Sequence, residues 1–418
     1  MSGLLFSGAR VLTPGGEWPT GWLATDDRRI ARMGQGAPPP GTPGLQVDAR
    51  GLTLLPGFVD VHVHGAVGVD VMDADPDGLR RMARFFARHG VTAWCPTTWT
   101  GSERDTLRAL EAVAEVAGPV DGGATVLGAH LEGPFLNPAR CGAQDRSLIR
   151  VAGPAEVERL LASGVVRLLA VAPEVEGNAW LVAAAAGRGV TVAAGHTDAT
   201  YQQALRAVAD GVRHVTHAFN AMRPLGHREP GMLGAALTVP ELTCELIADN
   251  VHVHPAVMRL LLRAKGSEGV VLVTDAVRAA GLPDGAYELG DRQAIKIDGA
   301  IRLGDGTLAG SVLTLDRALH NLQAASGRPL AELWPATSRN AVRALGLDAA
   351  TGSLAPGKDA DLVLLGPDLE VVATVVQGEI VHGAERLPGA SARVRSPSGD
   401  GTSGRAPPTH QPRPSGPS

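Results

Sequence analysis

Six histidine and carboxylate residues follow apolar stretches of this sequence at points where strands would end. They are, in chain order, His62, His64, Glu132, His196, His217 and Asp275. Residues i and i+2 of a strand share one face, so the two histidines that end 58-FVDVHVH-64 point the same way. Such a pair can bind a metal ion, although H-x-H alone fits an ordinary surface pair equally well.

The chemistry that these residue types support is metal-assisted hydrolysis. Imidazole and carboxylate together suit Zn²⁺, with Fe²⁺, Mn²⁺ or Co²⁺ as alternatives. Such a metal lowers the pKa of bound water from about 15.7 toward about 7 and polarises a carbonyl group. A neighbouring carboxylate can take a proton from that water and pass it to a leaving amine. Asp275, the last of the six, is the candidate for this acid/base role.

Each of the six residues also has a structural explanation when it is taken alone. Glu132 and His196 fit helix capping, His217 fits a buried core histidine, and Asp275 fits the cap of a turn. Their joint occurrence at five strand ends is much harder to explain in this way. The set as a whole therefore favours one shared site.

Eight apolar segments, separated by helix-like segments, are expected to position these residues. They are 58–64, 91–97, 125–133, 165–174, 190–196, 212–220, 243–250 and 270–275. Residues 198–211 are typical of the intervening helices, with Asp198 as the expected N-cap and Gly211 as the terminator. The alternation predicts an α/β fold, a (β/α)8 TIM barrel with its site at the carboxyl ends of the strands. A doubly wound open sheet is the alternative, but no G-x-G-x-x-G follows an early strand.

The two ends of the chain differ from this middle part because they contain short strand-like stretches between turns. Residues 1–56 and 351–386 are expected to meet in one small β-sandwich domain, beside a barrel domain at 57–350. A hairpin insertion is expected within the barrel at about 276–309. The tail at 387–418 is rich in Pro, Ser, Gly and Arg and is expected to be disordered.

The composition is that of a soluble globular protein. Of 418 residues, 44% are hydrophobic, and the net charge of −5 gives no reason to expect a nucleic acid or a membrane as partner. No signal peptide or membrane-spanning run is recognisable. The cysteines, Cys95, Cys141 and Cys244, are few and scattered, which suits a reducing compartment, so a cytoplasmic location is expected.

The longer motifs around these residues resemble those of a known family. The motifs are 56-PGFVDVHVHG-65, 130-HLEGPFLNP-138, 194-AGHTDAT-200, 216-THAFNAM-222 and 272-LVTDA-276. They are similar to the amidohydrolase superfamily of metal-dependent hydrolases, and within it to the N-acetylglucosamine-6-phosphate deacetylase family. The resemblance covers residues from about 4 to 384 and implies a TIM barrel with a small β-sandwich. It also implies removal of acetate from N-acetyl-D-glucosamine 6-phosphate in amino-sugar catabolism and recycling.

The resemblance implies metal ligands residue by residue. Glu132, His196 and His217 match the principal ligands of the family. His62 and His64 match a second metal position that some members keep and others lose. One or two divalent metal ions per subunit are therefore expected, with zinc favoured.

The resemblance further implies the acid/base and the residues that hold the substrate. Asp275 matches the acid/base of the family, and Asn220 and Ala221 match a loop that contacts the substrate phosphate. Arg228 and His252 match phosphate-binding residues, one of which reaches across a dimer interface. Arginine offers a planar fork that matches phosphate oxygens. A homodimer acting on a phosphorylated N-acetylhexosamine is thus expected.

Two further positions, Gln144 and Cys141, are expected near the site. Gln144 stands where some family members have a histidine that contributes to substrate contact, and an amide cannot become cationic. Cys141 falls on a loop expected to fold over the site, where its thiol is either a substrate contact or a spectator.

Two alternative functions fit the sequence less well. Another amidohydrolase, such as an aminoacylase or a cyclic-amide hydrolase, is disfavoured because no lysine stands at a strand end and Asn220 and Arg228 are both present. A catalytically inactive relative that serves as an assembly protein is disfavoured because the full set of ligands is present. The sequence leaves open the native metal and the preference between glucosamine and galactosamine substrates.

Overall fold

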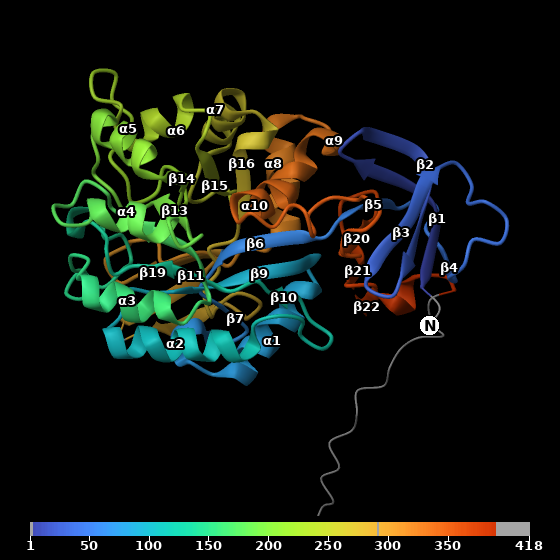
Figure 1. Ribbon diagram of the computed structural model, residues 1–418, viewed down its shortest axis with the longest axis horizontal. Helices are drawn as coiled ribbons and strands as arrows, with labels where there is room; N and C mark the ends of the chain where they lie inside the picture. Colours follow the sequence, from blue (N-terminus) through green and yellow to red (C-terminus); the bar gives the residue numbers. More distant parts are fainter. Residues whose placement is uncertain (1–2, 291, 390–418) are drawn as a thin grey trace, which may run out of the picture.

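The computed structural model describes residues 3–290 and 292–389. A large unit of strands and helices lies beside a smaller unit of strands that comes from both ends of the chain (Figure 1). Residues 390–418 of the expected tail lie outside the described residues. The tail was expected to begin at residue 387, but Leu387 is buried in the core of the smaller unit. This apolar side chain directly follows the short helix η5 (Ala384–Arg386) and packs back onto that core.

Eight parallel strands form a closed barrel, which confirms the predicted fold class. In ring order they are β6 (Phe58–Val63), β9 (Val91–Thr98), β11 (Ala129–Glu132), β12 (Val166–Val171), β13 (Thr191–Ala194), β14 (Val212–Val215), β15 (Thr243–Ile247) and β16 (Val270–Val273). The short strand β10 (Thr125–Val126) pairs with β9 and leads into β11. The ring closes where Asp275 N donates to His62 O at 2.9 Å and His64 N donates to Ala276 O at 2.8 Å.

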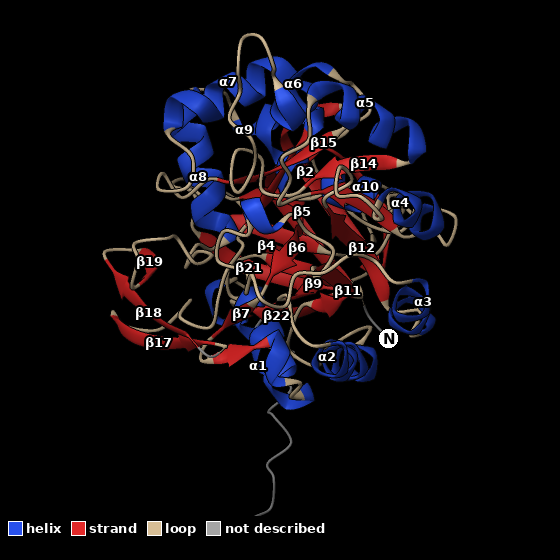
Figure 2. Ribbon diagram, turned by 90° about the vertical axis from the view of Figure 1, so that its left-hand side faces the viewer, coloured by secondary structure: helices blue, strands red, loops and turns tan. Residues whose placement is uncertain are grey.

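A helix follows each barrel strand, and the helices surround the strands (Figure 2). They are α1 (Pro76–Ala87), α2 (Glu103–Val116), α3 (Pro154–Ala162), α4 (Ala179–Ala186), α5 (Tyr201–Asp210), α6 (Gly231–Thr238), α7 (Pro255–Lys265) and α8 (Leu315–Ser326). In α1, Asp75 caps the N-terminus, and the buried Leu79, Met82 and Phe86 recur on one face. Every residue of β6 and β9 is buried, as expected for parallel strands covered by helices.

One helix begins later than the sequence suggested. Asp198 was expected to cap α5, but Thr200 occupies the N-cap and forms a capping box with Gln203. Asp198 instead forms ion pairs with Arg140 and Arg223, each at 2.6 Å. The expected N-cap was wrong, because the Asp198 carboxylate pairs with two guanidinium groups on neighbouring loops.

The smaller unit confirms that the two chain ends meet. Its strands are β1 (Leu4–Thr13), β2 (Gly16–Asp26), β3 (Arg29–Gln35), β4 (Leu45–Asp48), β5 (Thr53–Pro56), β20 (Leu362–Leu365), β21 (Val371–Val376) and β22 (Glu379–His382). They run in the order β22-β21-β20-β5-β1-β2-β3, with β4 beside β1. Phe6, Leu54 and Leu364 are buried together in its core. The domain limits proposed from the sequence stay predictions.

The insertion that follows β16 has three antiparallel strands, where a hairpin was expected. β18 (Arg292–Ile297) and β19 (Ala300–Leu303) form a hairpin around 298-DG-299, a dipeptide that suits a tight turn, and β17 (Gly285–Leu289) adds a third strand. The remaining short elements are β7 (Gly65–Ala66), β8 (Val69–Asp70), η1 (Val71–Asp73), η2 (Pro138–Arg140), η3 (Ser267–Gly269), α9 (Leu330–Leu333), η4 (Trp334–Thr337) and α10 (Arg339–Ala344). Within residues 3–290 and 292–389, no helix is long and apolar enough to cross a membrane.

Candidate metal centre and active site

Glu132 lies at the centre of a cluster of imidazoles at the carboxyl ends of the barrel strands. Its Oε1 lies 3.2 Å from His196 Nε2 and 3.0 Å from His217 Nε2. Its Oε2 lies 3.1 Å from His64 Nε2, and His62 Nε2 lies 3.2 Å from His64 Nε2. All five side chains are buried. The structure therefore brings together the five residues that the sequence suggested as metal ligands.

The cluster divides into two groups of potential ligands. One contains Glu132, His196 and His217, and the other contains His62, His64 and Glu132. Within each group, one ligand atom per residue lies within 4.8 Å of the others. Glu132 belongs to both, and a carboxylate can offer one oxygen to each of two neighbouring ions. The donor set suits one or two divalent transition-metal ions.

The hydrogen bonds of two of these imidazoles fit metal binding. His196 Nδ1 lies 2.9 Å from the backbone carbonyl of Arg140, which can only accept, so Nδ1 carries the proton. His62 Nδ1 donates in the same way to Glu245 Oε2 at 2.9 Å. In their neutral forms, both rings then direct an Nε2 lone pair toward Glu132. A cation between these atoms would stabilise an arrangement that otherwise sets lone pairs against a carboxylate.

Protons occupy the same nitrogen atoms when no metal is bound. Burial lowers the pKa of His62, but the charges of Glu132, Glu245 and Asp275 outweigh burial and hold this pKa well above its ordinary value. Burial also lowers the pKa of His64, yet Asp275 and Glu132 raise it to about 9. Protons and metal ions therefore compete for these imidazoles, so metal binding is expected to weaken in acid.

Asp275 lies beside both groups of ligands. Its Oδ1 is 3.3 Å from His64 Nε2 and 3.5 Å from His62 Nε2, and 6% of the residue is exposed. Burial raises the pKa of Asp275, but His62, His64 and His217 together hold that pKa below its ordinary value. The carboxylate is thus ionised at neutral pH and can accept a proton.

The backbone is strained at three of the strand ends that carry these residues. His196, His217 and Asp275 have positive φ angles of 46°, 29° and 50°. Non-glycine residues rarely adopt this region, and such positions cluster at functional sites. The turns direct these three side chains into the barrel mouth, where Glu132 already lies.

The loop after β11 covers part of this site. Gln144 is buried, its Nε2 donates to Glu132 Oε2 at 2.7 Å, and its Oε1 accepts from Thr100 N at 2.7 Å. The structure therefore places Gln144 as a partner of Glu132. The half-buried Cys141 precedes Gly142, where an added Cβ would lie 3.4 Å from His196 Cε1. The loop that carries Cys141 thus passes close to His196, and a role for its thiol stays a prediction.

The expected substrate-binding residues lie on the loops around the mouth. Asn220 and Ala221 are half-buried and lie three and four residues after His217, and Ala221 has a φ of 48°. His252 Nδ1 donates to Asp249 Oδ2 at 2.6 Å, which fixes the imidazole at the end of β15. Arg228 is exposed on the loop between β14 and α6. Their roles toward a substrate remain predictions.

Sequence reasoning missed two residues that hold the candidate ligands in place. Glu245 on β15 is fully buried and accepts hydrogen bonds from His62 and from His214. The Trp99 ring stacks on His64 at 3.9 Å between centroids and 19° between planes. An acidic residue inside the apolar strand 243-TCELI-247 was the available signal for Glu245.

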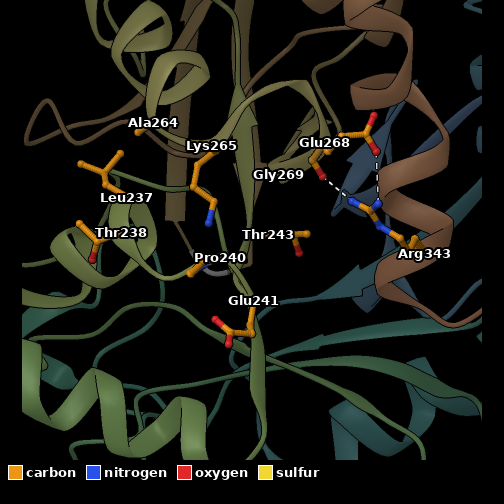
Figure 3. Close-up of a pocket in the computed structure, with 10 residues that line it drawn as sticks. All are labelled: Leu237, Thr238, Pro240, Glu241, Thr243, Ala264, Lys265, Glu268, Gly269 and Arg343. Carbon is orange, nitrogen blue, oxygen red and sulfur yellow. Dashed lines mark hydrogen bonds and ion pairs between the residues drawn. The ribbon is translucent and has the colours of Figure 1, made fainter. Parts of the chain in front are cut away.

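A separate pocket of about 440 Å³ lies near the amino ends of β15 and β16, at the other end of the barrel (Figure 3). Its lining includes Lys265 and Glu241, and Arg343 on its wall forms an ion pair with Glu268 at 3.2 Å. It contains none of the six residues singled out above. The site for metal chemistry is therefore the cluster at the carboxyl ends.

Comparison with known proteins shows the family to which this chain belongs. The amidohydrolase family matches residues 53–381. The chain belongs to the amidohydrolase family, whose members generally depend on divalent metals, and the two ligand groups around Glu132 agree with that dependence.

Within the amidohydrolase family, the chain is similar to deacetylases of phosphorylated acetylamino sugars. The chain is 40% identical over 362 residues to the N-acetylgalactosamine-6-phosphate deacetylase of Escherichia coli O157:H7, covering 86% of this chain and 96% of that protein. It is 35% identical over 386 residues to the N-acetylglucosamine-6-phosphate deacetylase of Bacillus subtilis, covering 90% and 96%. A mutant of the Mycobacterium smegmatis N-acetyl-D-glucosamine-6-phosphate deacetylase in complex with N-acetyl-D-glucosamine-6-phosphate is 36% identical, with a TM-score of 0.86 over 91% of this chain and 100% of that chain.

Proposed function

We propose that this protein is a metal-dependent deacetylase that hydrolyses N-acetyl-D-glucosamine 6-phosphate to D-glucosamine 6-phosphate and acetate, in amino-sugar catabolism and recycling. The observation that carries the proposal is the convergence of Glu132, His196 and His217 on one point, with the carboxylate of Asp275 inside the same buried mouth. The named relatives act as deacetylases of phosphorylated acetylamino sugars, which supports the same substrate class for this chain.

The metal position at Glu132, His196 and His217 is proposed as the principal one, and that at His62 and His64 as a second. Zinc is the proposed ion, because two imidazoles and a carboxylate are a ligand set of catalytic zinc sites. When bound, such an ion lowers the pKa of water and polarises the acetyl carbonyl.

The residues of the chain supply proton transfer and orientation. Asp275 Oδ1 takes a proton from the attacking water as the new C–O bond forms, and returns a proton to the amine nitrogen as the C–N bond breaks. Gln144 holds Glu132 in place through its 2.7 Å hydrogen bond. Asn220, Ala221, Arg228 and His252 are proposed to contact the phosphate of the sugar, with Arg228 supplied by the second subunit of a homodimer.

A second candidate substrate is N-acetyl-D-galactosamine 6-phosphate. The E. coli relative that carries this name is 40% identical, which exceeds the 35% of the B. subtilis N-acetylglucosamine-6-phosphate deacetylase. The two sugars differ only in the configuration of one hydroxyl group, so the same metal centre and phosphate contacts serve both.

An acetate-release assay tests the proposal. The purified protein is incubated with N-acetylglucosamine, its 6-phosphate and N-acetylgalactosamine 6-phosphate, each with and without a chelator. We expect the highest kcat/KM on N-acetylglucosamine 6-phosphate and loss of turnover with the chelator, restored by Zn²⁺. Preference for the galactosamine derivative would establish the second candidate, and no acetate from any of the three would overturn both.

A further inference from the structure

Glu245 is a buried carboxylate that accepts hydrogen bonds from one residue of each ligand group, His62 and His217. It is a member of neither group. It lies on β15, between β14 and β16 in the barrel, and is 0% exposed (Figure 1). A buried charge is strongly unfavourable unless donors surround it. Three donors do so: His62 Nδ1 at 2.9 Å, His217 N at 2.9 Å and His214 Nε2 at 3.1 Å.

The bond to His62 decides which nitrogen of that ring can bind a metal. A neutral imidazole has one N–H and one lone pair, and a carboxylate acceptor at Nδ1 draws the proton to that side. The lone pair is then on Nε2, which faces His64 Nε2 at 3.2 Å and Glu132 Oε1 at 3.5 Å. When the ring is neutral, Glu245 is the acceptor that favours the tautomer with its lone pair on Nε2, and loss of Glu245 removes this preference.

The bond to His217 is of another kind, because it comes from the backbone. Glu245 Oε2 accepts from His217 N, and Glu245 O accepts from Ala218 N at 2.9 Å. A neutral amide carbonyl group can also accept such a backbone hydrogen bond, although the bond is weaker than one to a carboxylate. The negative charge of Glu245 therefore matters more to His62 than to His217.

We propose that Glu245 is the positioning residue that fixes the tautomer of His62 and thereby makes the second metal position, at His62 and His64, able to bind its ion. The inference rests on the metal centre of the proposed function. Buried carboxylates that orient a histidine ligand in this way raise its basicity, and their loss weakens metal affinity by about 10- to 100-fold.

The variants Glu245→Gln and Glu245→Leu test the proposal. Each protein is treated with a chelator and then titrated with Zn²⁺ in a calorimeter. The metal content that remains after dialysis is measured as well. Gln keeps the size and one carbonyl acceptor, and His214 can change tautomer because its Nδ1 lies 2.6 Å from the hydroxyl of Thr243. We expect the wild type to bind two equivalents of Zn²⁺ per subunit. Glu245→Gln should weaken the second about tenfold and leave the first unchanged, and Glu245→Leu should lose the second.

Asp361→Asn is the matched control, since it removes a carboxylate that is also buried but lies in the smaller unit, before β20. It should bind both equivalents as the wild type does. Equal weakening of both equivalents in Glu245→Gln, an unchanged second equivalent in both Glu245 variants, or a wild type that binds only one ion would overturn the inference. Acetate release by the same wild-type sample separates the two proposals, because an active enzyme with one ion contradicts this inference alone.

Discussion

At the scale of single residues, the acid/base role depends on Asp275, which lies 3.3 Å from His64 Nε2 in a nearly closed site. Asn has the same size and also tolerates the φ of 50° found here, but it cannot take a proton. We expect Asp275→Asn to lower kcat by about 10²- to 10⁴-fold while the metal content stays close to that of the wild type. Steady-state assays and metal analysis of the same sample check this expectation. Near-normal turnover in the variant would exclude Asp275 as the acid/base.

The residues of the site differ in how far the sequence could predict them. Histidines and carboxylates at the ends of apolar strands could be recognised because barrel geometry places all such ends at one rim. Glu245 stood out only as an acidic residue in an apolar strand, and its role could not be predicted because His62 lies 183 residues away in the chain and His214 lies 31 away. The acidic residue in β15 can support a ligand on β6 only when the ring closes, because closure leaves β16 alone between these two strands.

At the scale of elements, the start of α5 shows where local patterns fail. Asp198 was the N-cap expected from the sequence, and Thr200 is also of a residue type that caps helices. Asp198 is taken by Arg140 and Arg223, which come from the loops after β11 and β14. Tertiary ion pairs therefore shift the helix start to Thr200, whose hydroxyl accepts from Gln203 N at 3.3 Å.

The cap of α5 predicts a measurable stability difference. Thr200→Ala removes the acceptor for the Gln203 amide and should lower the free energy of unfolding by about 1 kcal/mol. Thr200→Ser keeps the hydroxyl and serves as the control, with a change well below that of the alanine variant. Chemical denaturation at neutral pH compares the three proteins. An alanine variant as stable as the serine variant would show that the cap contributes nothing here.

The strand β20 is preceded by Asp361, a buried carboxyl group that links stability to pH. Its Oδ1 accepts from Gln377 N at 2.9 Å and its Oδ2 accepts from Thr351 Oγ1 at 2.7 Å. Burial outweighs these bonds and raises the pKa of Asp361 to about 6, from an ordinary value of 3.8. The folded state then binds a proton more tightly than the unfolded state does between these two values. This group therefore makes the protein lose stability as pH rises from about 4 to about 6.

Asp361→Asn should remove this contribution. The amide is neutral at all pH values, and it can accept from Gln377 N and donate to Thr351 Oγ1. Relative to the wild type, the variant should gain stability at pH 7, by up to roughly 3 kcal/mol for a shift of this size, and show little difference at pH 4. Denaturation of both proteins across this range provides the measurement. A variant less stable than the wild type at pH 7 would contradict the expectation.

At the scale of the whole molecule, the barrel and the joining of both chain ends followed from the order of strand-like and helix-like segments. Each of the eight barrel strands overlaps one of the eight segments expected from apolar runs, and most of the strands are shorter than those segments. The expected homodimer stays a prediction, because the structure contains a single chain. That expectation comes from the family resemblance, in which either Arg228 or His252 crosses the interface. The side chain of Arg228 is exposed. Its loop is held by Glu229, which accepts from Tyr201 N at 2.7 Å and from Gly231 N at 3.0 Å.

Mixed dimers can show whether Arg228 acts on the site of its own subunit or on that of the other. Arg228→Ala should raise KM for the phosphorylated sugar and leave that for the unphosphorylated sugar nearly unchanged, since it removes a contact to the phosphate. In a hybrid with Asp275→Asn, the site that keeps Asp275 receives an intact Arg228 only if that arginine comes from the partner. About a quarter of all sites should then regain a low KM after the two variants are unfolded and refolded together, because about half of the dimers are hybrids. If Arg228 acts within its own subunit, every hybrid lacks either the acid/base or the phosphate contact at each site, and the activity at low substrate equals the mean of the two separate variants.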